Sequence, residues 1–372
     1  MRYDFWKDTV QNELQALLRN NTWSLCSLPS NRRAIGCKWL FKVKKKTDGT
    51  VDWYKARLLA KGFSQHAGLD FRDTFSPVVR AVTIRTVLVI IVMKGWSLRQ
   101  IDVNNGFLNA LYGLRQAPRA WFHTLRQFLV DHLSFHALKA DPSLFIRASS
   151  NSYLLLMAYV NDIVITGNSN ADIDNVVVQL HHKFALKDMG NLNFFLGIEV
   201  RHVSGTVPQS KKSFICRWSV VPECGWYAPC SKKQAVVSRS SSETEYRSLA
   251  NCISELLWVK QLLGEVGMPV VQSLMVWCDN TSTVSMAANP THHARVKHVE
   301  IDHHFVREKV LDGSIQVNFV PSANQVADVL TKPITPKQFA VFRQALQVFA
   351  SNDKVDNSKE NGENVSVTNK SG

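Results

Sequence analysis

Residues 153–167 read YLLLMAYVNDIVITG: an apolar run, two polar turn-forming residues, and a second apolar run that ends at a glycine. Both runs favour β-structure, and Asn and Asp favour turns. The stretch therefore predicts a tight β-hairpin with Asn161 and Asp162 at its tip. A hairpin presents its tip on a rigid support, from which a carboxylate can be aimed at a metal ion. We expect the rest of the site to be built around Asp162.

A second acid, Asp102, lies upstream in an apolar, strand-like setting, in the sequence QIDV at residues 100–103. Taken alone, Asp102 has the features of a capping or turn acid. Two strand-borne acids that converge, however, can hold Mg²⁺ for phosphoryl or nucleotidyl transfer, because hard divalent cations take oxygen ligands. The pair of Asp102 and Asp162 therefore predicts a metal site.

The whole chain has 372 residues, which is long enough for two domains with ordinary cores, and its hydrophobic content of 45% is typical of globular proteins. Its formal net charge of +14 and its pI near 9.5 are unusual. A solvated basic surface is one explanation of this charge. The excess over this length favours the other, a polyanionic partner such as nucleic acid.

Targeting and redox features point to a soluble intracellular protein without a membrane partner. The N-terminus is polar and charged, unlike a signal peptide, and the longest apolar run, Val87 to Met93, is too short to span a bilayer. The seven cysteines are scattered and match no standard zinc pattern, which favours free thiols. The five histidines between 292 and 304 lack a cysteine pair, so a basic segment facing nucleic acid is favoured over a zinc site.

The first part of the chain predicts a helix and a basic ribbon. Residues 1–28 show apolar positions at helical spacing until Asn20-Asn21 ends the helix. Two β-prone stretches, 36–46 and 51–62, flank the turn Asp48-Gly49, and the first alternates cations with apolar residues. Such a ribbon suits contact with phosphates, although a solvated hairpin face remains an alternative.

The second part predicts alternating helices and strands. A Ser/Thr cluster precedes an apolar periodic run, which predicts a helix that begins near Ser240 and continues to about Leu263. Strands are predicted at 274–280 and 314–321, and residues 323–328 are predicted to open a further helix.

Four phrases then give a specific resemblance. They are YKARLLAKGF at 54–63, TFSPVV at 74–79, LYGLRQAPRAWF at 111–122 and FLGIEV at 195–200. Together, and in this order, they resemble the polymerase of Ty1/copia-type retrotransposons, and residues 159–162 resemble the Tyr-x-Asp-Asp motif of reverse transcriptases with Asn161 in place of its first aspartate. With the C-terminal half, the resemblance covers nearly everything from residue 5 to about 345.

The resemblance implies an α+β right-hand polymerase with fingers and palm, followed by an α/β ribonuclease H-like domain with a mixed sheet. It implies that FLGIEV forms the hairpin that grips the primer. It also assigns metal-binding roles to Asp102, with Val103 accepting through its backbone, and to Asn161 and Asp162 as the remaining ligand positions. In the nucleotide site, it places Lys55 and Arg57 beside the incoming triphosphate. Phe107 is expected under the sugar, and Gln116 is expected to line the nucleotide pocket.

In the second half, the resemblance implies that Glu245, Asp279 and Asp328 are the metal-binding carboxylates of ribonuclease H, although each alone is typical of a surface or cap acid. The implied cofactor is Mg²⁺ or Mn²⁺. The implied partners are an RNA template, a DNA primer, an RNA–DNA hybrid and dNTPs, with assembly in a virus-like particle. The implied compartment is the cytoplasm, with the nucleus as a second one.

The sequence departs from the family at three places: Asn161, the jump from Asn109 to Leu111 where members carry several dozen further residues, and residues 206–230, which replace the thumb, the connector and the first ribonuclease H strand with its leading aspartate. The expected domains are therefore a truncated reverse transcriptase at 1–205, an aberrant junction at 206–230, a ribonuclease H-like domain at 231–345 and a disordered tail at 346–372. We expect activity to be impaired in this copy. A relic that binds nucleic acid without turnover, or a chain that does not fold stably, is the alternative.

Overall fold

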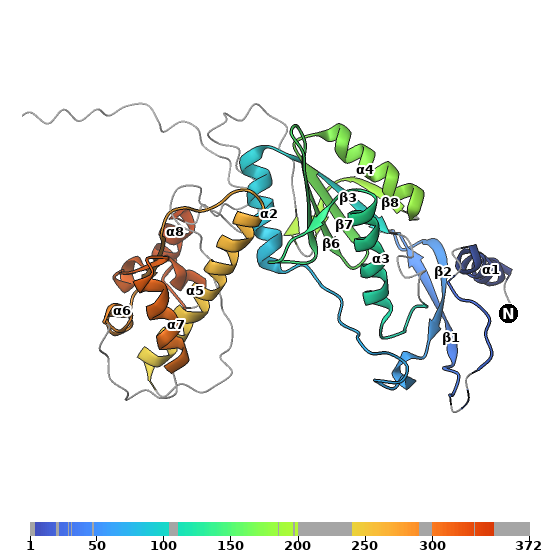
Figure 1. Cartoon of the computed structure of the whole chain (residues 1–372), viewed down its shortest axis with the longest axis horizontal. Coiled ribbons are helices and arrows are strands. Elements are labelled where there is room, and N and C mark those ends of the chain that lie inside the picture. Colours follow the sequence, from blue (N-terminus) through green and yellow to red (C-terminus); the bar gives the residue numbers. More distant parts are fainter. Residues whose placement is uncertain are drawn as a thin grey trace, which may run out of the picture. The chain divides into compact units, whose positions relative to one another are not determined.

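The structure is a computed structural model, in which two compact units can be distinguished (Figure 1). Among the described residues, the first unit holds those up to 195 and those of 250–274, and the second holds 198–199, 240–249 and those from 275 onward. The described residues are 4–19, 22–28, 30, 32–46, 48–103, 111–184, 186–195, 198–199, 240–289, 300–330 and 332–345. The predicted domain boundaries remain predictions, since 206–230 and the tail lie outside these ranges.

A six-stranded antiparallel sheet forms the centre of the first unit, in the order β4-β5-β6-β7-β3-β8. The expectation of mixed α and β structure with a multi-stranded sheet is thus confirmed for this unit. The strands are β3 (Ser97–Val103), β4 (His136–Ala137), β5 (Leu144–Ala148), β6 (Tyr153–Tyr159), β7 (Asp162–Gly167) and β8 (Leu186–Asn191).

Both faces of this sheet are covered, which is why β6 and β7 are apolar nearly throughout. One face packs on α3 (Ala117–Asp131) and α4 (Asn170–Lys183), and alternate strand residues lie in the shared core with Leu125 and Val176. Residues of the opposite parity, such as Leu155 and Val164, are also fully buried. The helix α2 (Ala81–Lys94) is apolar and ends at Gly95, whose φ of 66° provides the left-handed cap that this residue type allows.

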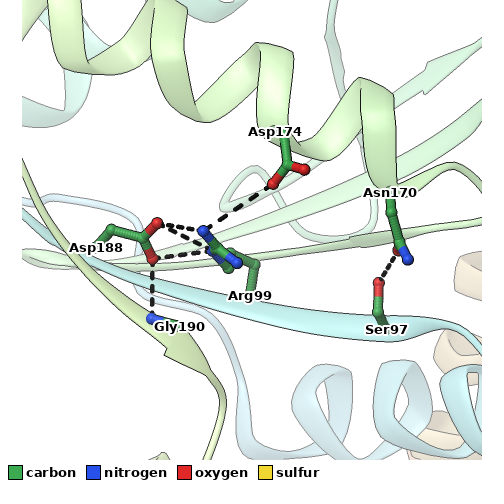
Figure 2. Close-up of polar contacts among 6 residues, drawn as sticks. All are labelled: Ser97, Arg99, Asn170, Asp174, Asp188 and Gly190. Atoms are coloured by element: carbon green, nitrogen blue, oxygen red, sulfur yellow. Dashed lines mark hydrogen bonds and ion pairs between the residues drawn. The ribbon is translucent and has the colours of Figure 1, made fainter.

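The strand β3, which carries Asp102, is fixed at its other end by polar contacts (Figure 2). Arg99 donates from Nε and Nη2 to the carboxylate of Asp188 on β8, at 2.9 and 2.5 Å, and lies 4.0 Å from Asp174 on α4. Ser97 Oγ donates to Asn170 Oδ1 at 2.5 Å. The pKa of Asp188 is lowered because the hydrogen bonds from Arg99 and Gly190 outweigh its partial burial. These contacts connect β3 to both β8 and α4.

The predicted basic ribbon is present as β1 (Cys37–Lys45) and β2 (Val51–Ala60), joined through Asp48-Gly49. The helix α1 (Asp4–Arg19) packs on β2 through its aromatic rings, with the ring centroids of Phe5 and Tyr54 4.2 Å apart. The prediction that Asn20-Asn21 ends this helix is confirmed, because α1 ends at Arg19. The Leu17 carbonyl accepts from both the amide and the hydroxyl of Thr22, which terminates the helix, and residues 22–28 are not helical.

The C-terminal part of the chain begins with α5 (Ser241–Glu265), in agreement with the predicted helix. Its second half belongs to the first unit, where Trp258 Nε1 donates to the Ala140 carbonyl and Glu265 accepts from the Lys139 amide at 2.7 Å. Two short strands, β9 (Phe194–Phe195) and β10 (Ile198–Glu199), overlap the predicted primer-gripping hairpin at 195–200, whose role stays a prediction.

In the second unit, β11 (Leu274–Cys278) and β12 (Ile315–Phe319) pair as predicted strands, and the larger mixed sheet stays a prediction. The expected helix opening at 323–328 is wrong. Two 3₁₀ turns occupy this segment, and the next α-helix begins only at Pro336. The remaining elements are α6 (Thr281–Ala288), α7 (Glu300–Leu311), η5 (Ser322–Asn324), η6 (Val326–Leu330) and α8 (Pro336–Ala345). In the described part of the chain, no helix combines the length and the apolar character needed to cross a bilayer.

Candidate active site

Asp102 and Asp162 lie directly opposite each other on the neighbouring strands β3 and β7. The predicted hairpin is present, but its two-residue tip is Val160-Asn161, not Asn161-Asp162. The shift arises because Asp162 pairs with Tyr159 on β6 as well as with Asp102 on β3, so it is the first residue of β7. Asp162 is thus held by strands on both sides.

The two carboxylates share a face of the sheet. Ile101, Val103 and Ile163 belong to the core under α3 and α4, so the alternation of side chains along a strand places Asp102 and Asp162 on the opposite face. The Cβ atoms of such directly opposed residues are separated by about 4.5–5.5 Å. Partial burial and the neighbouring Asp102 raise the pKa of Asp162, while a hydrogen bond from Gln100 acts in the other direction. Asp102 and Asp162 therefore form a pair of like charges, and a divalent cation bound by both carboxylates would reduce their repulsion.

The hairpin tip next to these acids is conformationally strained and firmly held. Val160 has φ of 54°, in the left-handed region that a β-branched residue rarely adopts. Trp121 Nε1 donates to the Val160 carbonyl at 2.7 Å, and the Val103 amide donates to the Asn161 carbonyl at 2.9 Å. Both tip carbonyls are therefore fixed by neighbouring elements, which is how strain persists at a functional site.

The side chain of Asn161 carries the observation that bears on a metal. Its Oδ1 is buried and has no hydrogen-bond partner among the described residues. A buried carbonyl oxygen without a donor is costly unless something absent from the structure satisfies it. Two carboxylates and one neutral oxygen are all hard ligands, which fit Mg²⁺ or Mn²⁺, although with one negative charge fewer than three acids would supply.

Two predicted phosphate-binding cations lie on β2. Arg57 places its guanidinium carbon 4.6 Å from the centroid of the Tyr112 ring. The pKa of Lys55 is lowered, first by burial and then by Arg57, while attraction to Glu13 and Asp102 opposes the shift. Lys55 therefore lies within electrostatic reach of Asp102.

A partner of these cations, Glu13, was not identified from the sequence. This α1 residue has a buried Oε1 with no hydrogen-bond partner among the described residues. Burial raises its pKa, against the attraction of Arg57 and Lys55. One signal was available, because Glu13 lies three residues after Val10 and four before Leu17 on the apolar side of the amphipathic helix.

The predicted nucleotide-pocket residue, Gln116, is hydrogen bonded to a residue that sequence reasoning missed. Gln65 is only 5% exposed, and its Nε2 donates to Gln116 Oε1 at 2.9 Å. Lys187 on β8, also missed, lies opposite Asp102 in the strand register. Phe107 falls within 104–110, outside the described residues, so its role stays a prediction.

In the second unit the predicted acids converge. Ligand atoms of Glu245, Cys278 and Asp279 lie within 4.8 Å of one another. Lys332 Nζ lies 2.8 Å from Asp328 Oδ1 and 3.5 Å from Asp279 Oδ2, so the three acids surround one region. The pKa of Glu245 is raised by burial and by Asp279. Burial also raises the pKa of the Cys278 thiol, which leaves the carboxylates as the anionic ligands.

Comparison with known families identifies the family to which the chain belongs. A family profile described as reverse transcriptase (RNA-dependent DNA polymerase) matches residues 20–111 and 109–225, more than half of the chain. The chain belongs to the reverse transcriptase family. The profile match breaks at 109–111, the place at which the sequence jumps from one family phrase to the next.

Curated relatives identify the type of reverse transcriptase. The chain is 29% and 28% identical to the retrovirus-related Pol polyproteins from transposons RE1 and RE2 of Arabidopsis thaliana, over 93% and 94% of its length, and 24% identical to that from transposon TNT 1-94 of Nicotiana tabacum over 90%. It spans about a third of each relative, at 33%, 34% and 37%. The resemblance to copia-type Pol polyproteins is confirmed. No solved structure matches.

The alignment lengths also bear on the interruptions. The alignment with the RE1 polyprotein has 497 positions, whereas 93% of 372 residues is about 346, so about 150 positions of the relative have no counterpart in this reverse transcriptase chain. The placement of missing segments at 109–111 and 206–230 stays a prediction.

Proposed function

We propose that this chain carries the polymerase site of a copia-type reverse transcriptase, which extends a DNA primer on an RNA template by nucleotidyl transfer from a dNTP. The observation that carries the proposal is the direct pairing of Asp102 with Asp162, which follows Asn161 in the chain, and the side-chain oxygen of Asn161 is buried without a partner among the described residues. We assign Mg²⁺ or Mn²⁺ to Asp102, Asp162 and Asn161, with the Val103 backbone as a further acceptor.

In this proposal, the metal neutralises charge that develops on the phosphate oxygens and on the attacking hydroxyl. Lys55 and Arg57 bind the triphosphate, and buried Glu13 limits their mutual repulsion. Gln116 and Phe107 line the nucleotide pocket, with Phe107 under the sugar. The right-hand arrangement of fingers and palm, the primer-gripping role of 195–200, and assembly with template, primer and virus-like particle partners belong to the same proposal.

The test is primer extension on an RNA template, compared between the parent and Asp162→Asn. The variant is expected to lose at least about 100-fold in rate, because a metal ligand loses its charge. Asp131→Asn, which removes an exposed carboxylate at the end of α3, is the control and should extend as the parent does. Equal extension by the parent and Asp162→Asn would contradict the proposal.

Thermal unfolding distinguishes a chemical defect from misfolding. The folded pKa of Asp162 is raised, so its ionised form costs stability as the pH rises through that pKa, and the cost is absent below about pH 4. At neutral pH, Asp162→Asn should therefore melt at or above the parental temperature. Added Mg²⁺ should stabilise the parent more than the variant, since binding to the folded state raises its stability.

A second activity is favoured by the convergence of Glu245, Asp279 and Asp328: metal-dependent cleavage of RNA in an RNA–DNA hybrid. Asp279→Asn should reduce hybrid cleavage by at least about 100-fold. The control is Glu308→Gln, which removes a carboxylate that is 68% exposed on α7. Binding to a hybrid that weakens steeply with salt, but with no cleavage by the parent, would support the non-catalytic alternative.

A further inference from the structure

A chain of three groups fixes how Gln116 presents its amide. The backbone N–H of Arg115 can only donate, and it donates to Gln65 Oε1 at 2.9 Å. The other end of the Gln65 amide must then be its NH₂ group, which donates to Gln116 at 2.9 Å. The atom of Gln116 that accepts is therefore Oε1, and the orientation of both amides follows from one unambiguous backbone donor.

Gln65 is well placed to enforce this orientation because it is held in a packed joint. The backbone N–H of Gln65 donates to the Gly62 carbonyl at 3.1 Å, and Arg115 Nε donates to the same carbonyl at 3.1 Å. A Cβ atom on Gly62 would lie 1.9 Å from the Gly113 carbonyl oxygen, so the segments that hold Gln65 and Gln116 approach as closely as two backbones can. The buried Gln65 side chain has little freedom to rotate.

This orientation determines which atom of the Gln116 amide is left to bind a ligand. Its Oε1 is engaged, so its Nε2 remains as a donor, and among the described residues no acceptor takes a hydrogen bond from it. Gln116 is half-buried at the beginning of α3 and makes no capping hydrogen bond there. The end of the side chain that points away from Gln65 therefore offers N–H donors to a ligand.

We propose that Gln65 is a positioning residue that sets Gln116 as a hydrogen-bond donor toward an acceptor oxygen of the incoming deoxynucleoside triphosphate. This inference rests on the proposed function, which places Gln116 in the nucleotide pocket. It adds Gln65, a residue outside the pocket, which decides whether Gln116 donates or accepts in its contact with the nucleotide.

The first experiment measures the dissociation constant of a dNTP from the full chain with primer–template and Mg²⁺, for the parent and Gln65→Glu. The glutamate keeps the shape and accepts from the Arg115 amide, but its second oxygen cannot donate. Gln116 must then turn its NH₂ toward residue 65 and present Oε1 to the nucleotide. Binding is expected to weaken about tenfold, which corresponds to about 1.4 kcal/mol.

A double-mutant cycle separates positioning from general damage. In a Gln116→Ala background, Gln65→Glu should change dNTP binding by less than about twofold, because the residue through which it acts is gone. An equal loss in both backgrounds would show a merely structural role and would overturn the inference.

A second variant avoids any disturbance of the buried joint. Gln116→Glu can still accept from Gln65 Nε2 with one oxygen, but it presents an anionic acceptor to the nucleotide. It should therefore bind dNTP more weakly than Gln116→Ala does. Parental or tighter binding by Gln116→Glu would overturn the inference while leaving the proposed function intact, whereas a parent that binds no dNTP would overturn both.

Discussion

Replacing Asn161 with aspartate is expected to raise Mg²⁺-dependent primer extension by about 100-fold or more. Asn161 lies at the hairpin tip beside Asp162, and its buried Oδ1 has no partner among the described residues. The Asn161→Asp variant keeps the size of the side chain and restores a negative charge. Since changes in the shell around a metal already alter affinity or activity by about 10- to 100-fold, a full charge on a direct ligand should do at least as much.

Metal binding gives the same prediction a second readout. Asn161→Asp should bind Mg²⁺ more tightly than the parent, and its melting temperature without metal should be lower. The reason is that a third carboxylate joins Asp102 and Asp162, and burial together with the proximity of Asp102 already raises the pKa of Asp162. Added Mg²⁺ should reverse this loss, because the metal binds only to the folded site.

The control for this experiment is Asn161→Ala, which removes the amide oxygen as well as the charge. A parent that extends better than Asn161→Ala would show that the neutral oxygen contributes to the site. Equal extension by the parent and Asn161→Asp would contradict the importance of the missing charge. If neither the parent nor Asn161→Asp extends the primer, the interruption at 109–111 is the limiting defect. A substitution at the hairpin tip then cannot restore polymerase activity.

The sequence predicted those parts of the site that depend on local pattern. The two apolar, β-prone runs predicted β6 and β7, and the apolar setting of Asp102 predicted β3, and with them the expectation that two strand-borne acids converge. The tip was misplaced by one residue because it is set by register, and the register of Asp162 depends on Asp102, which lies 60 positions away in the chain. Periodicity within a hairpin cannot report such a long-range constraint.

The missed residues share a physical reason. Gln65 and Glu13 are polar side chains whose role comes from buried contacts with distant segments, and a lone amide or acid has no periodic signal. The segment at 323–328 was predicted to open a helix, but two 3₁₀ turns occupy it. In the structure, Ser322 Oγ donates to Asp279 Oδ2, and this neighbourhood is built from short 3₁₀ turns that bring Asp328 toward Asp279. Tertiary contacts override local propensity there.

Replacing Gly113 with alanine is expected to destabilise the first unit by about 2–5 kcal/mol. Two costs combine. Gly113 has φ of 89°, a conformation that costs an L-residue about 1–2 kcal/mol. An added Cβ would also lie 2.3 Å from the Ala60 carbonyl oxygen, so the backbones of β2 and of the segment before α3 would have to separate, at a further cost of about 1–3 kcal/mol.

Comparison with Gly49→Ala isolates the second cost, that of the close backbone approach, because Gly49→Ala carries only the first. Gly49 has φ of 84°, almost the same as Gly113, but an added Cβ there would meet nothing within 4 Å. The free energy of unfolding of Gly49→Ala should therefore fall by only about 1–2 kcal/mol. Urea unfolding followed by tryptophan fluorescence measures both variants. Equal losses would contradict the close approach of Ala60 and Gly113. A larger loss for Gly113→Ala, with weaker dNTP binding at temperatures where it stays folded, would show that this contact holds the ribbon cations and Gln116 in one site.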